Sequence, residues 1–402
     1  MKILFLSYPF IPGSFGGELI VSIERFESLI QRGHIVEVIT SGIKESSEQP
    51  YQGSLKILRS PYVHHSKFGR GLRRLVFPWW AGMQLFRSRP DLLHLGSVGG
   101  IDPITNMIGS LFVLSAAKLT GAKTVWVHSL ADSEENAFTN EGFANWCRSI
   151  WLGIIDRIVS VSPALEKDVK IFFPVKSIEI VCGIRDDLFQ LNSEGSRSNL
   201  RVTNNVEPEN IVLVFLGSIT KRKGFDILAR AFEKLVRDNP ELRLWVIGPI
   251  SNSENQNINN HEVQEITSPL LALKEKVTYF GKVIDRPRLA KILNAGDIFV
   301  FPSIREGFGI APGEAMACGL PVVISKIPGV TDLMVVEGET GLFCEPGDTE
   351  GLTTAIRKLI LDPGLRKRMG AEGRKRIVER FGWDKHIDDW ENLYLTLARK
   401  VE

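Results

Sequence analysis

The strongest constraint on the fold is an alternation of short apolar runs with longer stretches of helical spacing along this 402-residue chain. The runs are continuous, so they predict strands buried on both faces of a parallel sheet. The predicted strands of the first half are Lys2–Ser7, His34–Thr40, Asp91–Gly96, Thr124–Ser129, Arg157–Ser162 and Ser177–Cys182. Those of the second half are Ile211–Gly217, Leu242–Gly248, Val277–Gly281, Ile298–Ser303 and Pro321–Ser325.

The same strand-and-helix theme occurs twice, which predicts an α/β protein with two doubly wound domains. A single core stops growing at roughly 250–300 residues, so the length also favours two domains. The polar stretch Gln190–Asn210 predicts a linker or surface loop between domains at 1–190 and 205–380. Predicted helices are Gly17–Arg32, Ile104–Leu119, Gly224–Arg237, Arg286–Ala295 and Thr349–Leu361. Ligands of such sheets bind beyond the carboxyl ends of the strands, so functional residues should follow strands.

Composition excludes several classes of protein. The net charge of +2 gives no support to nucleic-acid binding. No stretch reaches roughly 18 apolar residues, so no membrane span is predicted, and MKILFLSYPFIPG is typical of a buried strand rather than a signal peptide. The four cysteines lack metal-ligand and C-x-x-C spacing, which predicts reduced thiols in a cytoplasmic protein; they are Cys147, Cys182, Cys318 and Cys344.

The most informative segment is Phe301–Ser325, FPSIREGFGIAPGEAMACGLPVVIS. We expect a strand, a glycine-containing loop with Glu306, and a helix whose first turn holds Pro312 and Glu314. A helix N-terminus offers free N–H groups to a phosphate, and carboxylates accept hydrogen bonds from paired sugar hydroxyls. The plainer alternative is that Glu314 complements the helix dipole and that Glu306 is a solvated loop acid.

This segment resembles the E-x7-E signature of the family 4 retaining glycosyltransferases, also described as group 1. NAGDIFVFPS before it and IPGVTDLMVVEGETGLFCEPGD after it are similar to the family, as are DRIVSVSPALEKDV and VCGIRDDLF. The resemblance implies the GT-B fold, in which two Rossmann-like domains face a central cleft. It also implies a C-terminal helix that returns to the first domain, and Trp383–Lys400 has the apolar pattern of such a helix.

The resemblance implies that Glu314 binds the ribose of a nucleoside diphosphate sugar. It implies that Glu306 contacts the transferred sugar, while Gly307, Phe308 and Gly309 supply backbone contacts. The family does not generally need a D-x-D motif, and none lies between the first-domain strands. We therefore expect no metal and no separate cofactor.

A second segment, FLGSITKRKGFDILARAF, places a basic loop between a strand and a helix. Cations there suit the charge that develops on a departing diphosphate. Lys223 matches the lysine of the family's K-G-F element. The family often has arginine where this chain has Ser218, so Arg222 or Lys221 would have to supply the second cation. A solvated basic loop is the alternative.

Two first-domain features also match the family. Gly16 and Gly17, which follow the first strand, match a glycine pair beside the donor phosphates. His128, at the end of TVWVHS, matches a histidine near the anomeric centre and the acceptor, although a lone histidine there is more often structural. Asp132 and Glu134 follow on the same loop and could contact the acceptor.

The segment Gln49–Pro90 contains eight Lys or Arg residues and no acid. Within residues 67–89, bases are interleaved with Phe68, Phe77, Trp79 and Trp80. This pattern suits an anionic membrane surface or an anionic lipid-diphosphate acceptor. It also suits a solvated basic face with tryptophans packed inward.

The resemblance therefore implies a retaining hexosyltransferase that uses a nucleoside diphosphate sugar and a glycan or lipid-linked acceptor. Its expected place is cell-surface polysaccharide or glycolipid synthesis, in the cytoplasm or at the inner face of the membrane. The alternatives are a catalytically inactive binding protein and a nucleotide-sugar epimerase with the same architecture. A nicotinamide dehydrogenase is poorly supported, because no strand is followed by the glycine fingerprint and its acidic partner. The nucleotide base is left open.

Overall fold

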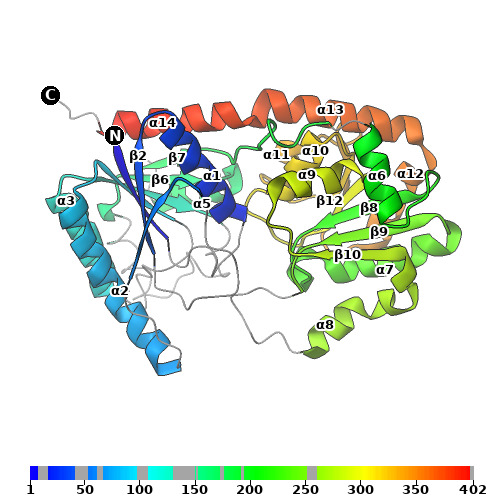
Figure 1. The fold of residues 1–402 in the computed structure, drawn as a ribbon, viewed down its shortest axis with the longest axis horizontal. Coiled ribbons are helices and arrows are strands. Elements are labelled where there is room, and N and C mark those ends of the chain that lie inside the picture. The colour runs from blue at the N-terminus through cyan, green and yellow to red at the C-terminus, as the bar shows by residue number, and fades with distance from the viewer. Residues whose placement is uncertain are drawn as a thin grey trace. The chain divides into compact units, whose positions relative to one another are not determined.

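The chain separates into two compact units. The computed structural model describes residues 1–7, 17–40, 53–60, 67–96, 107–129, 150, 153–172, 176–191, 194–250 and 260–398. The first unit comprises Met1–Cys182 together with Asp384–Glu402, and the second comprises Gly183–Trp383 (Figure 1). Each unit is built around its own parallel sheet.

The first unit has a seven-stranded sheet in the order β3-β2-β1-β4-β5-β6-β7. All of its strand pairs are parallel. The chain runs outward from β1 to one edge and then from β4 to the other, which makes the sheet doubly wound. The strands are β1 (Lys2–Leu6), β2 (Ile35–Thr40), β3 (Lys56–Arg59), β4 (Leu92–Leu95), β5 (Lys123–His128), β6 (Arg157–Ser160) and β7 (Ser177–Glu179).

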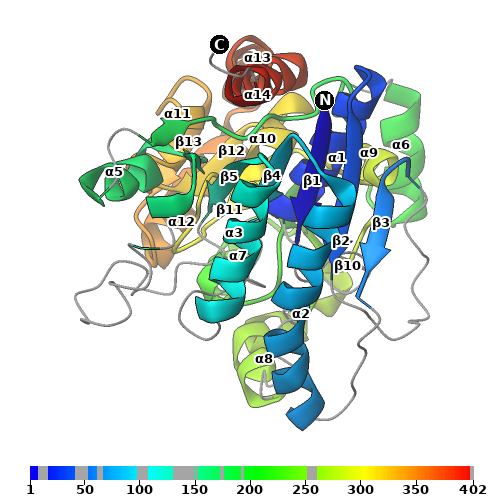
Figure 2. The same cartoon turned by 90° about the vertical axis from the view of Figure 1, so that its left-hand side faces the viewer.

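Helices cover both faces of this sheet because successive strand side chains point to opposite sides. On one face, Leu4 and Leu95 share a core with helices α2 (Lys67–Ser88) and α3 (Met107–Leu119), which lie side by side (Figure 2). On the other face, Phe5 and His94 contact rings from α1 (Gly17–Gln31) and α14 (Trp383–Ala398). Helix α5 (Pro163–Phe172) packs beside β6 and β7.

Helix α14 completes the core of the first unit. The Tyr394 hydroxyl lies 2.7 Å from Nδ1 of His94, and both side chains are fully buried. The Trp390 ring lies 5.3 Å from the His94 ring between centroids, and the Arg25 guanidinium lies 4.0 Å from the centroid of the Trp390 ring. His386 Nδ1 donates to the carbonyl of Val181 at 2.9 Å.

The second unit repeats the doubly wound order in a six-stranded sheet, β10-β9-β8-β11-β12-β13. Its strands are β8 (Ile211–Leu216), β9 (Leu242–Ile247), β10 (Val277–Gly281), β11 (Ile298–Phe301), β12 (Val322–Ser325) and β13 (Gly341–Cys344). All pairs are parallel. Two doubly wound parallel sheets confirm the predicted fold class.

The second sheet is also covered on both faces (Figure 1). Helices α7 (Phe225–Asp238) and α12 (Thr349–Leu361) share a core with β8 and β9. Helices α9 (Arg286–Asn294) and α10 (Ile310–Ala317) contact each other, and α10 packs closely on α13 (Pro363–Phe381). A Cβ added to Gly370 of α13 would lie 2.0 Å from the carbonyl oxygen of Gly319, so only glycine allows this approach. Short helices α8 (Asn260–Thr267) and α11 (Thr331–Met334) complete the unit.

Every strand predicted from an apolar run is present, with ends shifted by three residues or fewer. The prediction missed β3 and β13, which are edge strands. β3 has the sequence KILR and β13 the sequence GLFC, and neither forms a continuous run of apolar residues long enough to stand out. An edge strand meets the core on fewer sides, so its pattern is weaker.

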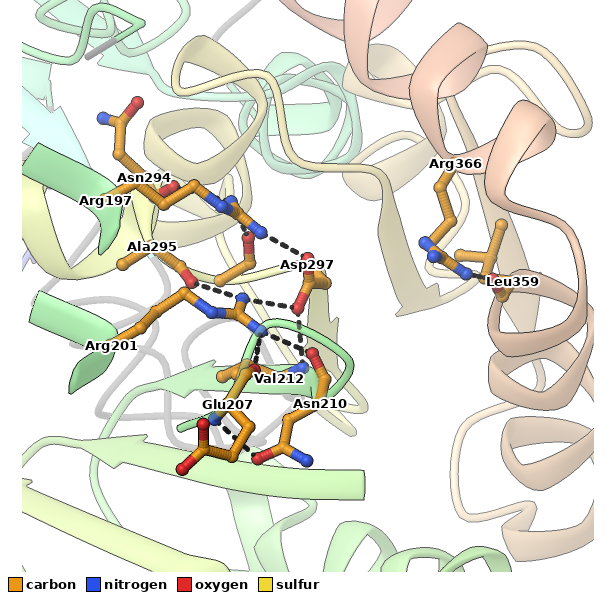
Figure 3. Close-up of polar contacts among 11 residues, drawn as sticks. Arg197, Arg201, Glu207, Asn210, Val212, Asn294, Ala295, Asp297, Leu359 and Arg366 are labelled. Carbon is orange, nitrogen blue, oxygen red and sulfur yellow. Dashed lines mark hydrogen bonds and ion pairs between the residues drawn. The ribbon is translucent and has the colours of Figure 1, made fainter. Parts of the chain in front are cut away.

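The interpretation of Gln190–Asn210 as a linker or loop is wrong. This stretch contains helix α6 (Glu194–Thr203), held by ion pairs to Asp297 (Figure 3). Arg197 Nη2 lies 2.5 Å and Arg201 Nη1 3.0 Å from the Asp297 carboxylate. Arg201 also donates to the carbonyls of Ala295 and Asn210. The segment is polar because its cations bind an acid and carbonyl groups of the same unit.

Three cysteines among the described residues are buried free thiols, Cys182, Cys318 and Cys344. Burial raises the pKa of each, to about 12 for Cys182 and to about 11 for Cys344. No helix in the described ranges is both long enough and apolar enough to cross a bilayer.

Candidate functional site

The predicted donor residues of the second unit follow two neighbouring strands. Successive strands are added toward one edge from β8 to β10 and toward the other edge from β11 to β13, so the strand order reverses between the neighbours β8 and β11. Lys223 ends the short 3-10 turn Lys221–Lys223 after β8, and Glu306 lies in the loop after β11. Ligands of doubly wound sheets bind at this kind of switch point.

Lys223 and Glu306 form a buried ion pair. Nζ of Lys223 lies 2.5 Å from Oε1 of Glu306, and the side chains are 16% and 9% exposed. Ser303 Oγ donates to the same carboxylate oxygen at 2.7 Å, and Arg222 Nη1 lies 3.8 Å from it. Burial lowers the pKa of Lys223, and Arg222 adds to that effect, while Glu306 opposes it. Burying two charges costs desolvation energy, so such a pair at a switch point is a candidate site.

Close backbone packing fixes the loop that carries Lys223. Gly224 has φ +66°, and a Cβ there would lie 1.8 Å from the carbonyl oxygen of Pro302. The Thr220 hydroxyl accepts a hydrogen bond from the Lys223 amide at 3.3 Å. The Ile304 amide donates to the carbonyl of Arg222 at 2.9 Å. The two loops are therefore joined through their backbones, which positions the ion pair.

The glycine-containing loop leads directly into helix α10. Gly307 is half-buried, and Gly309 is the N-cap with φ +89°. The Phe308 side chain is buried, with its ring 5.9 Å from that of Phe381, and so anchors the loop. The first N–H groups of a helix have no partner within it. The first N–H groups of α10 therefore lie at the end of this loop, where a ligand could accept hydrogen bonds from them.

The expected place of Glu314 in the first turn of its helix is wrong. Helix α10 begins at Ile310, so Pro312 lies in the first turn but Glu314 falls in the second. The helix starts earlier because Gly309 adopts the left-handed conformation that ends the loop. Glu314 therefore does not complement the dipole from the first turn.

Glu314 instead forms an ion pair with Arg286. Arg286 Nη2 lies 2.7 Å from Glu314 Oε1, and the carboxylate side chain is only 4% exposed. Arg286 is the first residue of α9, and its guanidinium lies 4.8 Å from the centroid of the Phe189 ring. Sequence reasoning missed Arg286, although it follows β10 and therefore meets the criterion that site residues lie just after strands.

The other basic residues of the β8 loop differ in their surroundings. Arg222 has an exposed side chain that donates to the carbonyl of Arg305 at 3.1 Å, close to Glu306. Lys221 Nζ lies 3.0 Å from the exposed carboxylate of Glu265. Ser218 is half-buried at the end of β8. Of the two bases proposed to replace the expected arginine, Arg222 is the one beside the buried pair.

The remaining predicted residues belong to the first unit. His128 ends β5, is buried, and packs against the Trp126 ring at 5.3 Å between centroids. Burial lowers the pKa of His128 to about 4, so the ring is neutral at pH 7. Gly17 is the first residue of α1. Gly16, Asp132 and Glu134 lie outside the described residues.

No cluster of three or more His, Cys, Asp or Glu side chains able to hold a metal ion occurs in the described part of the chain. The polar groups that follow β8, β10 and β11 along the chain are cations, two carboxylates and the start of a helix. Such a set fits a ligand that carries both phosphates and hydroxyl groups.

Residues 196–376, which lie in the second unit, match the family model described as "Glycosyl transferases group 1". The second unit therefore contains a group 1 glycosyl transferase segment. The match includes every predicted donor residue of this unit, from Ser218 and Lys223 to Glu306 and Glu314. The recognition of this family from the E-x7-E segment is therefore confirmed.

Relatives and solved structures extend the similarity beyond this unit. The chain is 32% identical over 220 residues to the capsular polysaccharide biosynthesis glycosyltransferase CapM of Staphylococcus aureus, a match that spans about half of that protein (54%). It is 24% identical to N-acetyl-alpha-D-glucosaminyl L-malate synthase of Bacillus anthracis, over 99% of this chain and 98% of that one. The structure of Anabaena Alr3699/HepE in complex with UDP-glucose has a TM-score of 0.74 at 17% identity, covering 98% and 100% of the two chains. The chain thus has the GT-B fold.

Proposed function

We propose that this protein is a retaining glycosyltransferase. It transfers a hexosyl unit from a nucleoside diphosphate sugar to a hydroxyl group of a glycan or lipid-linked acceptor. The observation that carries the proposal is the buried Lys223–Glu306 pair at the switch point of the second sheet. The family match and the position of this pair between two strand ends both favour a donor site here.

In the proposed donor site, Lys223 and the first N–H groups of α10 bind the diphosphate. Both present positive charge or donors to an anion, and the lysine is held in place by Glu306 and by the backbone of its turn. Arg222 is the second cation, in the role that arginine has after the strand in many family members. Ser218, which is small and uncharged, then leaves room for the donor but contributes no positive charge.

The two glutamates act on different parts of the donor. Glu314 accepts hydrogen bonds from the ribose hydroxyls, and Glu306 contacts the transferred sugar, with backbone contacts from Gly307, Phe308 and Gly309. Because Glu306 already shares a hydrogen with Lys223, it couples the sugar to the cation that faces the diphosphate. For Gly16, Gly17 and His128 of the first unit, the roles implied by the family resemblance remain part of the proposal.

The reaction exchanges one bond of the anomeric carbon. The bond to the diphosphate oxygen breaks, and the bond to the acceptor oxygen forms on the same face. The acceptor's hydroxyl proton passes to the departing phosphate oxygen, so no other co-reactant is needed. Lys223 and Arg222 stabilise the negative charge that grows on the leaving group. Positioning of both substrates supplies the rest of the rate acceleration. No metal ion is required in this scheme.

UDP is the nucleotide that we propose first. The HepE complex with UDP-glucose supports UDP as the carrier, and CapM supports a role in cell-surface polysaccharide synthesis. The proposed location is the cytoplasm. The proposed acceptor is a glycan or a lipid-linked sugar.

A thermal-shift panel of UDP, GDP and ADP tests the donor site, because a ligand of the folded state raises its apparent stability by mass action. We expect UDP to give the largest shift, with no dependence on added Mg²⁺ or Mn²⁺ and no loss with EDTA. A Lys223→Ala variant should lose the shift. No shift with any nucleotide would contradict the proposal.

Turnover assays separate the alternatives. The preferred nucleotide sugar should be hydrolysed slowly without acceptor and transferred when a glycan or lipid-linked acceptor is added, with release of the nucleoside diphosphate and an α-configured product from an α-configured donor. An epimerase would convert the sugar without releasing nucleotide. An inactive binding protein would give the thermal shift but neither hydrolysis nor transfer.

A further inference from the structure

Ser303 lies buried between the two loops that carry the Lys223–Glu306 pair. It follows the end of β11 by two residues, and its hydroxyl has three oxygen atoms within hydrogen-bonding distance. Ser303 Oγ lies 2.7 Å from Glu306 Oε1, 3.1 Å from the carbonyl oxygen of Arg222 and 3.3 Å from that of Arg305. This serine therefore contacts both the loop after β8 and the loop after β11.

The single proton of the Ser303 hydroxyl goes to Glu306. A serine has one O–H donor, so it cannot bond all three oxygen atoms, and hydrogen bonds to charged acceptors are the stronger ones. The two carbonyl groups also have other donors. The Arg222 carbonyl accepts from the Ile304 amide at 2.9 Å, and the Arg305 carbonyl accepts from Arg222 Nη1 at 3.1 Å. Neither backbone oxygen depends on Ser303, whereas the carboxylate oxygen is the nearest of the three acceptors and carries charge.

The contacts of Glu306 are unevenly divided between its two carboxylate oxygens. Oε1 accepts hydrogen bonds from Ser303 and Lys223, and Arg222 Nη1 lies 3.8 Å from the same atom. Among the described residues, Oε2 has no hydrogen-bond or ion-pair partner. Each carboxylate oxygen has about two lone pairs, so the protein itself fills Oε1. Oε2 is the oxygen that is left to accept a hydrogen bond from a ligand.

We propose that Ser303 is a positioning residue of the donor site, and that it orients Glu306 so that Oε2 alone accepts a hydroxyl group of the transferred sugar. The inference rests on the proposed function, in which Glu306 contacts that sugar. A carboxylate with both oxygens open can accept two neighbouring donors at once, one at each oxygen. Because Oε1 is occupied, Glu306 discriminates between sugars at the position of one hydroxyl group.

Ser303 and Lys223 hold the same carboxylate oxygen in different ways. The serine has a short side chain close to the end of a buried strand, so its hydroxyl points in one of a few staggered directions. Lys223 supplies charge, but its flexible four-carbon stem allows many positions of the ammonium group. The terminal torsion of a glutamate is broad, so Lys223 alone would let the Glu306 carboxylate turn. Holding a group that contacts the substrate in the right geometry lowers the barrier to reaction.

Isothermal titration with UDP and initial rates with UDP-sugars separate the orientation of Glu306 from the folding of the site. UDP has no transferred sugar, so Ser303→Ala should change its Kd less than about twofold. The same variant should lower kcat at least about tenfold with the donor that wild type uses fastest among UDP-glucose, UDP-galactose and UDP-N-acetylglucosamine. Ser325→Ala is the matched control. Ser325 is also 1% exposed and ends the neighbouring strand β12, but its hydroxyl lies 4.0 Å from Cys344 Sγ, so both constants should stay as in wild type.

The double variant Ser303→Ala, Glu306→Gln shows whether the hydroxyl acts through the carboxylate. In the Glu306→Gln background, loss of the Ser303 hydroxyl should change kcat less than about twofold, because residues that act through one another are not additive. A folding defect would instead lower kcat in both backgrounds. Donors that each lack one sugar hydroxyl test the single contact. Loss of one particular hydroxyl should lower kcat/KM of wild type about tenfold and leave that of Glu306→Gln nearly unchanged.

Different results would overturn this inference and the proposed function. A wild type that binds no UDP and turns over none of the three donors would overturn the proposed function with UDP, and this inference with it. A wild type that does both, beside a Ser303→Ala variant as active as Ser325→Ala, would overturn the inference alone. A loss of kcat that persists in the Glu306→Gln background would do the same, as would two neighbouring hydroxyl groups that both couple to Glu306. Equal unfolding midpoints of Ser303→Ala and Ser325→Ala would assign the expected loss to the orientation of the carboxylate.

Discussion

Arg286 holds Glu314 through an ion pair of 2.7 Å between Nη2 and Oε1, although the two residues come from different helices. Arg286 begins α9, and Glu314 lies in the second turn of α10. The carboxylate proposed to bind the ribose is therefore already oriented by a guanidinium that itself rests on Phe189. This arrangement makes Arg286 a positioning residue of the proposed donor site.

Arg286→Gln should weaken UDP binding about tenfold, because the Glu314 carboxylate loses the group that orients it. The effect should nearly vanish in a Glu314→Gln background, since residues that act through one another are not additive. Isothermal titration of the two single variants and the double variant measures this coupling. Lys291→Gln, an exposed cation on the same helix, is the control and should bind like wild type. Additive effects in the double variant would show that Arg286 does not act through Glu314.

Lys223→Ala and Glu306→Ala should each lower kcat/KM by at least roughly two orders of magnitude, about 2.7 kcal/mol of transition-state stabilisation. Each removes one partner of the buried pair at the switch point. Lys221→Ala is the control within the same turn, because its ion pair with Glu265 is exposed, and it should change kcat/KM less than about threefold. Initial rates with the preferred nucleotide sugar check both. Near-normal activity of Lys223→Ala would remove that lysine from the site.

Gly224→Ala should destabilise the protein more than Gly281→Ala. Both glycines have positive φ, +66° and +65°, so both substitutions carry the left-handed penalty of about 1–2 kcal/mol. Only at Gly224 would the new Cβ also meet a backbone atom, the Pro302 carbonyl oxygen at 1.8 Å, whereas nothing lies within 4 Å at Gly281. Thermal-unfolding midpoints of the two variants separate backbone strain from the clash. Equal midpoints would mean that the two loops can move apart at no cost.

Acid should destabilise the first unit through its buried histidines. Burial lowers the pKa of His128 to about 4 and that of His386 to about 3, and it lowers the pKa of His94 as well. The unfolded chain keeps the ordinary value near 6.5, so below about pH 6.5 it binds protons that the folded state does not. Stability is therefore fully present above that pH and falls as the pH drops toward 4.

His386→Asn tests this linkage. An asparagine amide can replace the donor that His386 presents to the Val181 carbonyl, but it does not titrate. The variant's unfolding midpoint should fall less steeply than that of wild type between pH 6.5 and 4, because one proton fewer is taken up on unfolding. Parallel midpoint curves for the two proteins would exclude His386 as a contributor.

The architecture could be predicted because local patterns of apolar residues indicate most of its strands and helices. Runs such as Lys2–Ser7 are continuous and apolar, and they correspond to strands in the centre of a sheet. The edge strand β3 and helix α6 could not be predicted in this way. The stability of α6 comes from Arg197 and Arg201 reaching Asp297 about a hundred residues away, and no local pattern contains that partner.

The proposed donor site could be predicted in part for the same reason. Lys223, Glu306 and Glu314 follow strands and lie in recognisable segments. The pairing of Lys223 with Glu306 and of Glu314 with Arg286 depends on the order of strands in the sheet. That order could not be deduced from the positions of these residues along the sequence. The helix start at Ile310 depends on the conformation of Gly309, and it moved Glu314 from the first turn to the second.

Helix α14 determines when the first unit can complete its core during synthesis. Tyr394 and His94 are 300 residues apart in the chain, yet they share a buried hydrogen bond. Domains near the start of a chain usually fold while the rest is still being made. Among the described residues, the sheet face that carries Phe5 and His94 is covered only by Phe26 of α1 until Trp390 and Tyr394 have left the ribosome. The second unit, although encoded later, is a continuous stretch and can reach its native core first.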